Sequence, residues 1–203
     1  MTDAPIGVLL AAGRGRRAGG DKQLFPWPTA AGERPMVSAV FQTMRSVCST
    51  IVVVTGFDQD DVRAAVDPAA VLVEASSDAP MSESVVEGLR AAQRAAPQRR
   101  VLLQLVDFPA VRPATLRELV AATAQDDTEA YWVPAYQGQT GHPLLLTAPL
   151  AQAILNDGIP HGLRDFLRQH AASRQIVAVE DPFVLRDVDT MDDYHALRRD
   201  VDT

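Results

Sequence analysis

The sequence predicts an α/β protein: a single three-layer domain over residues 1–203, with a mostly parallel, Rossmann-like sheet and helices on both faces. Two observations support this fold class. Continuous apolar runs of strand length occur at 6–12, 50–56 and 100–107, as in parallel strands buried on both faces. Segments with apolar residues at helical spacing lie between these runs. Strands and helices therefore alternate along the chain, which favours a parallel sheet.

Shorter apolar runs predict the remaining strands, at 70–75, 130–136, 142–147 and 174–180. We expect the region 130–147 to supply an antiparallel element of the sheet. Residues 28–35 and 78–84 combine proline with glycine or serine and predict loops.

Helices are predicted where apolar side chains recur every three or four residues. The first covers 36–47, and the second begins at Ser84, where Glu87 three residues on forms a capping-box pattern. The third has Pro113 in its first turn and includes Leu116, and the fourth lies around 163–167.

Composition excludes several classes of protein. The net charge of −7 argues against a general nucleic-acid binder, which would carry a basic face. No stretch reaches about 18 apolar residues, so no membrane span is expected, and the first residues do not resemble a secretory leader. Cys48 is the single cysteine and cannot form an intramolecular disulfide. We therefore expect a cytoplasmic protein.

Polar and flexible residues follow the predicted strands where an α/β sheet binds its ligands, outside the carboxyl ends of the strands. Asp107 ends the run 100–107, and Asp187 and Asp189 follow the last strand. The first strand is followed by a glycine-rich, basic loop that contains Gly13, Gly15, Arg17, Gly19 and Lys22. Backbone amides and basic side chains hold phosphates, and carboxylates hold Mg²⁺, so the pattern suits a nucleoside triphosphate.

Each of these features also has a simpler explanation, which the residues alone leave open. The loop can be only a tight turn, Asp107 before Pro109 can merely end a strand, and Asp189 or Thr190 can cap the following helix. The loop is neither a GxxxxGK[ST] phosphate loop nor a complete GxGxxG fingerprint, because Ala18 stands at the third glycine position.

The segment LLAAGRGRRAGGDKQL, residues 9–24, resembles the signature loop of the MobA-like nucleotidyltransferases, LAAGxxxRxGxxKxL. Further segments fit that family in order along nearly the whole chain: VVVTGFDQDDVRAAV, MSESVVEGLRAA, DFPAVRPATLRELV, TGHPLLL and LRDVDTMDDYHAL. Within the family the chain most resembles the molybdenum cofactor cytidylyltransferases. The resemblance implies a fold like that of the nucleotide-diphospho-sugar transferases.

The resemblance also implies roles for matching residues. The turn that meets the base and ribose corresponds to Leu10, Ala11, Ala12 and Gly13, and the triphosphate loop to Gly15, Arg17 and Gly19. Lys22 matches the lysine that neutralises phosphate charge, and Ser84 lies in a loop that borders the nucleotide. Asp107 matches a ligand of Mg²⁺, with Asp189 as the second ligand and Asp187 as the alternative.

The implied reaction moves a nucleoside monophosphate from a nucleoside triphosphate to a phosphorylated acceptor, most similar to molybdopterin, and releases pyrophosphate. Ala12 favours CTP over GTP, since glycine at this position leaves more room for a purine. A molybdoenzyme or its chaperone is then a candidate partner. Two alternatives stay open: a non-catalytic nucleotide-binding accessory protein, and a family member that uses a different small-molecule acceptor.

The acceptor side corresponds to Gly141, His142 and Pro143. A lone histidine beside a strand is as readily a packing residue as a catalyst, so the role of His142 stays open. The sequence departs from the family at 161–164, where His161 precedes Gly-Leu-Arg in place of the usual Gly-Ala-Arg turn. This departure leaves the identity of the acceptor open.

Overall fold

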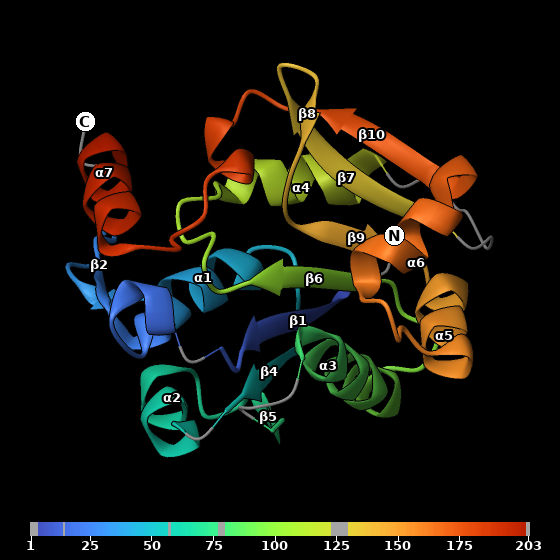
Figure 1. The fold of residues 1–203 in the computed structure, drawn as a ribbon, viewed down its shortest axis with the longest axis horizontal. Coiled ribbons are helices and arrows are strands. Elements are labelled where there is room, and N and C mark those ends of the chain that lie inside the picture. Colours follow the sequence, from blue (N-terminus) through green and yellow to red (C-terminus); the bar gives the residue numbers. More distant parts are fainter. Residues whose placement is uncertain (1–3, 14, 57, 77–79, 123–129, 202–203) are drawn as a thin grey trace.

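A computed structural model describes residues 4–13, 15–56, 58–76, 80–122 and 130–201. Its centre is an eight-stranded sheet (Figure 1). The strands are β1 (Ile6–Ala11), β4 (Ile51–Thr55), β5 (Val71–Glu74), β6 (Val101–Leu105), β7 (Tyr131–Tyr136), β8 (Gln139–Thr140), β9 (Leu144–Leu146) and β10 (Arg174–Ala178). Their order across the sheet is β10-β7-β9-β6-β1-β4-β5, and β8 pairs with β7.

The sheet is mostly parallel, as predicted. Strands β6, β1, β4 and β5 run parallel to one another, and β10 runs parallel to β7. Strand β9 lies between β6 and β7 and is antiparallel to both, which confirms the expected antiparallel element. Every residue of β1 and β4 is buried, because helices cover both faces of the central strands.

Two layers of helices complete the three-layer fold (Figure 1). One apolar core lies between the sheet and α3 (Met81–Ala95), α5 (Ala148–Asp157) and α6 (Leu163–Gln169). A second core lies on the other face, against α1 (Met36–Arg45), α2 (Gln59–Ala65) and α4 (Pro113–Ala122). The last helix, α7 (Met191–Val201), packs with β2 (Pro26–Trp27) at one end of the molecule, beside the partner strand β3 (Arg34–Pro35).

The start of α3 differs from the prediction. The helix begins at Met81, after Pro80 in an extended conformation, so residues 81–84 are helical and the predicted loop is wrong there; residues 77–79 lie outside the described part. Ser84 is therefore not an N-cap but a buried residue within the helix. It shares the buried face of α3 with Val85 and Leu89, and this packing fixes the helix where no side-chain cap does.

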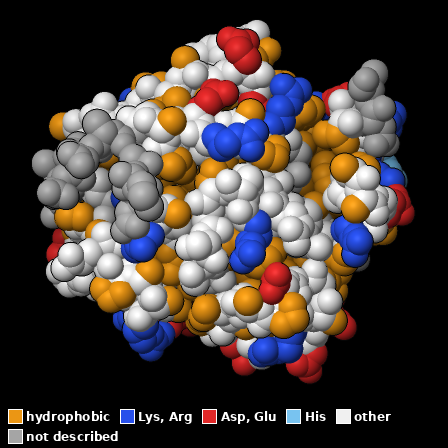
Figure 2. Space-filling view, turned by 180° about the vertical axis from the view of Figure 1, so that it is seen from behind, with side chains coloured by type: hydrophobic (Ala, Val, Ile, Leu, Met, Phe, Trp, Pro, Cys, Tyr) orange, Lys and Arg blue, Asp and Glu red, His pale blue; other side chains and the backbone are white. Residues whose placement is uncertain are grey.

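Two surface observations bear on partners. On the face turned away in Figure 1, basic side chains lie scattered among acidic and hydrophobic ones and do not form one patch (Figure 2). The described side chains of that face therefore do not form the continuous basic surface that nucleic-acid binding uses. Within the described ranges, none of the helices combines the length and apolar character needed to cross a membrane.

Candidate nucleotide and metal site

The glycine-rich loop folds back on itself directly after β1. The Gly15 carbonyl accepts hydrogen bonds from the Ala18 amide at 2.8 Å and from the Gly20 amide at 3.3 Å. Gly15 has a φ of +54°, and a Cβ added there would lie 2.0 Å from the Gly20 carbonyl oxygen. Only glycine fits this position. After this tight turn the chain enters a short 3₁₀ helix, η2 (Lys22–Leu24), whose first residue is the lysine of the motif.

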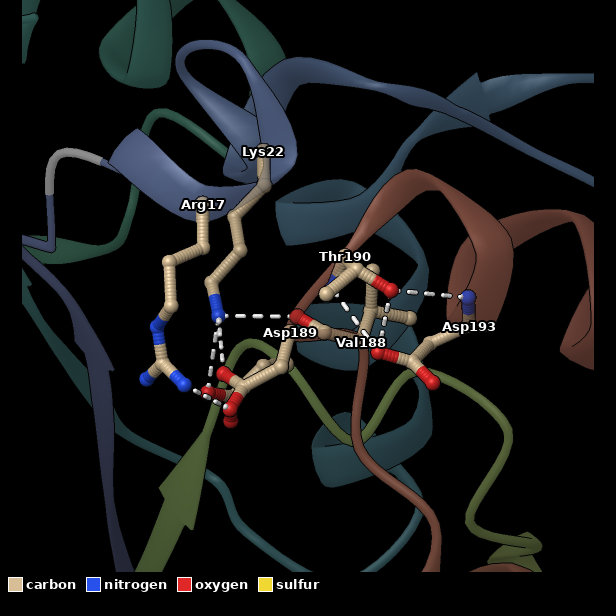
Figure 3. A network of polar contacts seen from close by, with 7 residues as sticks. Arg17, Lys22, Val188, Asp189, Thr190 and Asp193 are labelled. Carbon is tan, nitrogen blue, oxygen red and sulfur yellow. Dashed lines mark hydrogen bonds and ion pairs between the residues drawn. The ribbon is translucent and has the colours of Figure 1, made fainter.

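Lys22 is the only lysine among the 203 residues, and it stands at the centre of a polar network (Figure 3). Its Nζ lies 3.0 Å from Asp107 Oδ2 and 3.6 Å from Asp189 Oδ1, and donates to the Val188 carbonyl at 2.9 Å. Arg17 reaches the same carboxylate, with its Nη1 2.9 Å from Asp189 Oδ2. The two cations thus converge on carboxylates far away in the sequence.

Three carboxylates form an acidic cluster: Asp107, Asp187 and Asp189 each place one oxygen within 4.8 Å of the others. The Val188 amide donates to the Asp107 backbone carbonyl at 2.8 Å, and this bond ties the two chain segments together. Partial burial raises the pKa of Asp187, and the nearby carboxylates of Asp189 and Asp107 raise it further.

The acidic cluster fits a divalent cation. Asp107 Oδ1 is buried and has no hydrogen-bond partner among the described residues, so one oxygen is available for a ligand that the protein does not supply. Carboxylate oxygens are the ligands that Mg²⁺ and Mn²⁺ prefer. Asp107 and Asp189 also face the basic residues that would hold phosphate, whereas Asp187 is the most exposed of the three.

Asp107 and Asp189 of the acidic cluster line a cavity of about 280 Å³. We call it the smaller cavity, because a larger one lies next to it. Nine of the predicted residues line it: Leu10, Ala12, Gly13, Gly15, Arg17, Lys22, Ser84, Asp107 and Asp189. Gly19 lies on the exposed outer side of the loop, and Ala11 is buried in the core on the face of α1 and α4, because side chains alternate along β1. Neither is among the lining residues.

Further lining residues were not predicted. Ser76, Met81, Leu105 and Val106 also contact the smaller cavity, and Met81 is 61% exposed although it is a large apolar side chain. Met81 begins the segment MSESVVEGLRAA, whereas Ser76, Leu105 and Val106 belong to none of the motif segments.

The helix-cap interpretation of the closing segment is also correct. Thr190 Oγ1 accepts from the Asp193 amide at 3.2 Å, while Asp193 Oδ2 accepts from the Thr190 amide at 2.8 Å. This reciprocal pair begins α7 and fixes the chain next to Asp189 (Figure 3). The hydrogen bonds from Thr190 lower the pKa of Asp193. The capping role and the cluster role therefore fall on adjacent residues.

A larger cavity of about 710 Å³ adjoins the smaller one and shares Leu10, Met81 and Leu105 with it. Among the residues predicted for the acceptor side, Gly141, His142, Gly162, Leu163 and Arg164 line it. Pro143 is buried beside it, and His161 is exposed and does not line it.

His142 is held neutral beside this cavity. Burial lowers its pKa to about 4, and its Nδ1 has no partner among the described residues. Its ring packs 4.7 Å from that of Phe108, centre to centre. The residue before His142 is Gly141, where an added Cβ would lie 1.9 Å from the Val184 carbonyl oxygen. The backbone at Gly141 can therefore lie this close to Val184 only because glycine has no side chain.

Comparison with known proteins agrees with this geometry. The model of the MobA-like NTP transferase domain matches residues 7–174, from β1 to the start of β10. The chain belongs to the MobA-like NTP transferase family. The match includes the glycine-rich loop, Lys22 and Asp107, but ends before the segment with Asp187 and Asp189.

Several solved structures share the fold of this MobA-like domain. Rv0371c of Mycobacterium tuberculosis superposes with a TM-score of 0.80 at 26% identity, over 97% of this chain and 99% of that one. Another structure of Rv0371c holds manganese, with a TM-score of 0.72, 26% identity and the same coverage of both chains. A nucleotidyl transferase from Methanothermobacter thermautotroptrophicus gives 0.79 at 24% identity over 98% of each chain.

One curated protein is similar to part of this chain. The bifunctional enzyme IspD/IspF of Ruegeria sp. (strain TM1040) is 34% identical over 125 residues, which make up 61% of this chain. The matched segment is 31% of that enzyme, so the chain spans about a third of its length.

Proposed function

We propose that the protein transfers a nucleoside monophosphate from a nucleoside triphosphate, with CTP preferred, to a phosphorylated small-molecule acceptor. The observation that carries the proposal is the convergence of Lys22 and Arg17 on Asp107 and Asp189 at the wall of the smaller cavity. Membership of the NTP transferase family supports the same reaction. The larger cavity next to it supplies room for the acceptor.

In the proposed reaction, a phosphate oxygen of the acceptor attacks the α-phosphorus of the triphosphate. A P–O bond to this oxygen forms, and the bond to the leaving pyrophosphate breaks. Lys22 and Arg17 offset the charge that builds up on pyrophosphate. A phosphate monoester is already nucleophilic at neutral pH, so no general base is required. Positioning and electrostatics then supply most of the rate enhancement.

Asp107 and Asp189 are the proposed ligands of the divalent cation. When bound, Mg²⁺ or Mn²⁺ supplies Lewis-acid stabilisation of phosphate oxygens. We expect Asp107→Asn and Asp189→Asn each to abolish pyrophosphate release, and Asp187→Asn to keep most of it. Equal losses in Asp187→Asn and Asp189→Asn would instead assign both residues to the metal.

Ala12 supports the preference for cytidine. It lines the smaller cavity, where its methyl group takes space that a larger purine edge would need. One pocket methyl changes discrimination by about 1–3 kcal/mol. The ratio of kcat/KM for CTP over GTP should therefore exceed one in the wild type and fall in Ala12→Gly. A wild-type preference for GTP would overturn the choice of base.

Molybdopterin is the acceptor that we propose first, and its dinucleotide product would pass to a molybdoenzyme or its chaperone. The similarity to IspD/IspF favours a second candidate, a methylerythritol phosphate, which would be a different acceptor of the same cytidylyl transfer. The non-catalytic alternative predicts nucleotide binding with no turnover on either acceptor.

The test is pyrophosphate release from CTP, GTP, ATP or UTP with Mg²⁺ and each acceptor. Lys22→Ala should lower turnover by about 30- to 1000-fold, as expected for a loss of roughly 2–4 kcal/mol of transition-state stabilisation. Arg117→Ala, a change of an exposed cation on α4, is the matched control and should leave turnover unchanged. Binding of CTP without turnover on either acceptor would support the accessory protein.

A further inference from the structure

The body of the larger cavity is apolar. Its lining includes Leu103 on β6, Val133 on β7 and Leu144 on β9, with Val85 on α3 and Leu167 on α6. All five belong to the core between the sheet and α3, α5 and α6. The polar side chains of Ser82, Thr140 and His142 line other parts of the cavity. Hydroxyl groups of a polyol that face the five apolar side chains would lack partners, which is costly when they are desolvated. The cavity body therefore suits an apolar or aromatic ring system.

One end of the larger cavity is cationic. Three arginines line it, Arg164 and Arg168 on α6 and Arg174 at the start of β10, and we call them the arginine rim. Among the described lining residues there is no aspartate or glutamate. Asp165 pairs with Arg168 at 3.2 Å from outside the lining, which leaves an excess of positive charge in a protein of net charge −7.

The end of the arginine rim at Arg174 lies far from the acidic cluster. Arg174 pairs with Tyr131, and Tyr131 pairs with Leu146, which in turn pairs with Val101. Arg174 thus shares a row of the sheet with the first residue of β6. From there β6 runs four residues to Leu105, roughly 13 Å at about 3.3 Å per residue, and the acidic cluster lies beyond it. A ligand group at the rim is therefore not the group that reacts.

We propose that the arginine rim is an anion subsite for the far end of the acceptor. The acceptor then carries a second anionic group, such as a carboxylate or phosphate, joined through an apolar or aromatic body to the phosphate that reacts. Guanidinium groups suit this role because they bind planar or tetrahedral oxyanions through paired hydrogen bonds. This assignment rests on the proposed function, and it disfavours a short polyol phosphate.

Two fluorescent probes with the same ring system test the subsite. The first, 8-anilino-1-naphthalenesulfonate, has the aromatic body and an anionic group; the second, N-phenyl-1-naphthylamine, lacks the sulfonate. Binding of both is titrated on the full chain, on the double variant Arg168→Gln/Arg174→Gln and on the control Arg117→Gln. Arg168 and Arg174 are both exposed, so the double variant is expected to fold. Its circular dichroism spectrum and its melting temperature check this.

We expect the double variant to lose about tenfold or more in affinity for the sulfonate, since hydrogen bonds to charged groups are lost, and to keep its affinity for the neutral probe. Arg117→Gln should bind both probes like the wild type. Unchanged sulfonate binding would overturn the subsite. An equal loss for both probes would also overturn it, because the arginines would then maintain only the shape of the cavity.

Binding of CTP with Mg²⁺ and release of pyrophosphate are measured on the same preparations. A chain that fails to bind CTP contradicts the proposed function, whatever the probes show. A chain that turns over CTP but shows no sulfonate preference contradicts only the anion subsite.

Discussion

Replacement of Lys22 by methionine should lower the rate of catalysis and strengthen the binding of Mg²⁺ to the acidic cluster. The substitution keeps an unbranched side chain but removes the ammonium group that lies 3.0 Å from Asp107 and 3.6 Å from Asp189. Among the described residues, the acidic cluster, with its oxygens within 4.8 Å of one another, then keeps Arg17 alone as a paired cation. Arg17 is 76% exposed, so water screens much of its charge.

The size of the effect follows from burial. Removing one partner of a fully buried ion pair costs about 3–5 kcal/mol. The side chains of Lys22 and Asp107 keep 11% and 16% of their exposure, so we expect Lys22→Met to lower the free energy of unfolding by about 2–3 kcal/mol without divalent cations. Because the ammonium no longer competes for the carboxylates, Mg²⁺ should bind the nucleotide-free variant more tightly than the wild type. At a hundredfold excess over its Kd, a bound ion contributes about 2.7 kcal/mol.

The assay is urea unfolding of wild type and Lys22→Met, with EDTA and with MgCl₂, together with calorimetric titration of Mg²⁺. The control is Arg90→Met, which breaks an ion pair with Glu87 on α3, outside the acidic cluster. The control should show no gain in Mg²⁺ affinity. If Mg²⁺ stabilises the wild type as much as Lys22→Met, then Lys22 and the metal do not compete for the same oxygens.

Three further predictions concern stability. Thr190→Ala removes the hydroxyl that caps α7 and should cost about 1 kcal/mol in urea unfolding, and no loss would mean that packing alone fixes the helix. Gly88→Ala puts a Cβ 2.6 Å from Val8 Cγ1, so overpacking should lower the unfolding free energy by about 1–3 kcal/mol; a more stable variant would show that the core yields. The pKa of His142 falls to about 4 on folding, whereas the unfolded chain takes up this proton near pH 6.5. Stability should therefore decrease as the pH falls from 6.5 to about 4, by up to about 3 kcal/mol, and His142→Phe should lack this part of the pH dependence; an NMR titration of the ring near pH 6.5 would contradict the assignment.

The central strands could be predicted because they are buried on both faces, and such strands are continuous apolar runs in the sequence. The start of α3 could not, because Pro80 gives no side-chain cap and the helix is fixed by its buried face. Helix α5 was not predicted although its signals are present. Thr147 caps it, Pro149 lies in its first turn and Gly158 follows its end.

The site shows a similar division. Because ligands bind at the carboxyl ends of strands, two features were predicted to belong to one site: the glycine-rich loop after β1, and Asp107 after β6. The structure brings the two together, with Lys22 of the loop paired with Asp107. The bond from Val188 to the Asp107 carbonyl could not be predicted, because it depends on how a late segment crosses the sheet. Of the arginine rim, only Arg164 was expected on the acceptor side. Arg168 and Arg174 were missed, since α6 and the edge strand β10 meet only in three dimensions. That the Ala11 side chain lies in the core could not be predicted either, because the resemblance gives positions in a motif and not the face to which each side chain points.

The single lysine also gives the chain an unusual chemical selectivity. A typical protein of this size carries many lysines, so amine-reactive reagents label its surface at random. Here the ε-amino group of Lys22 is the only side-chain amine among the 203 residues, and the other basic side chains are arginines and histidines. The carboxylates and the Val188 carbonyl around Lys22 shield its amine, with 11% of the side chain exposed. Acylation at this position therefore reports directly on the occupancy of the site, and a mass spectrum of the intact chain suffices to read it.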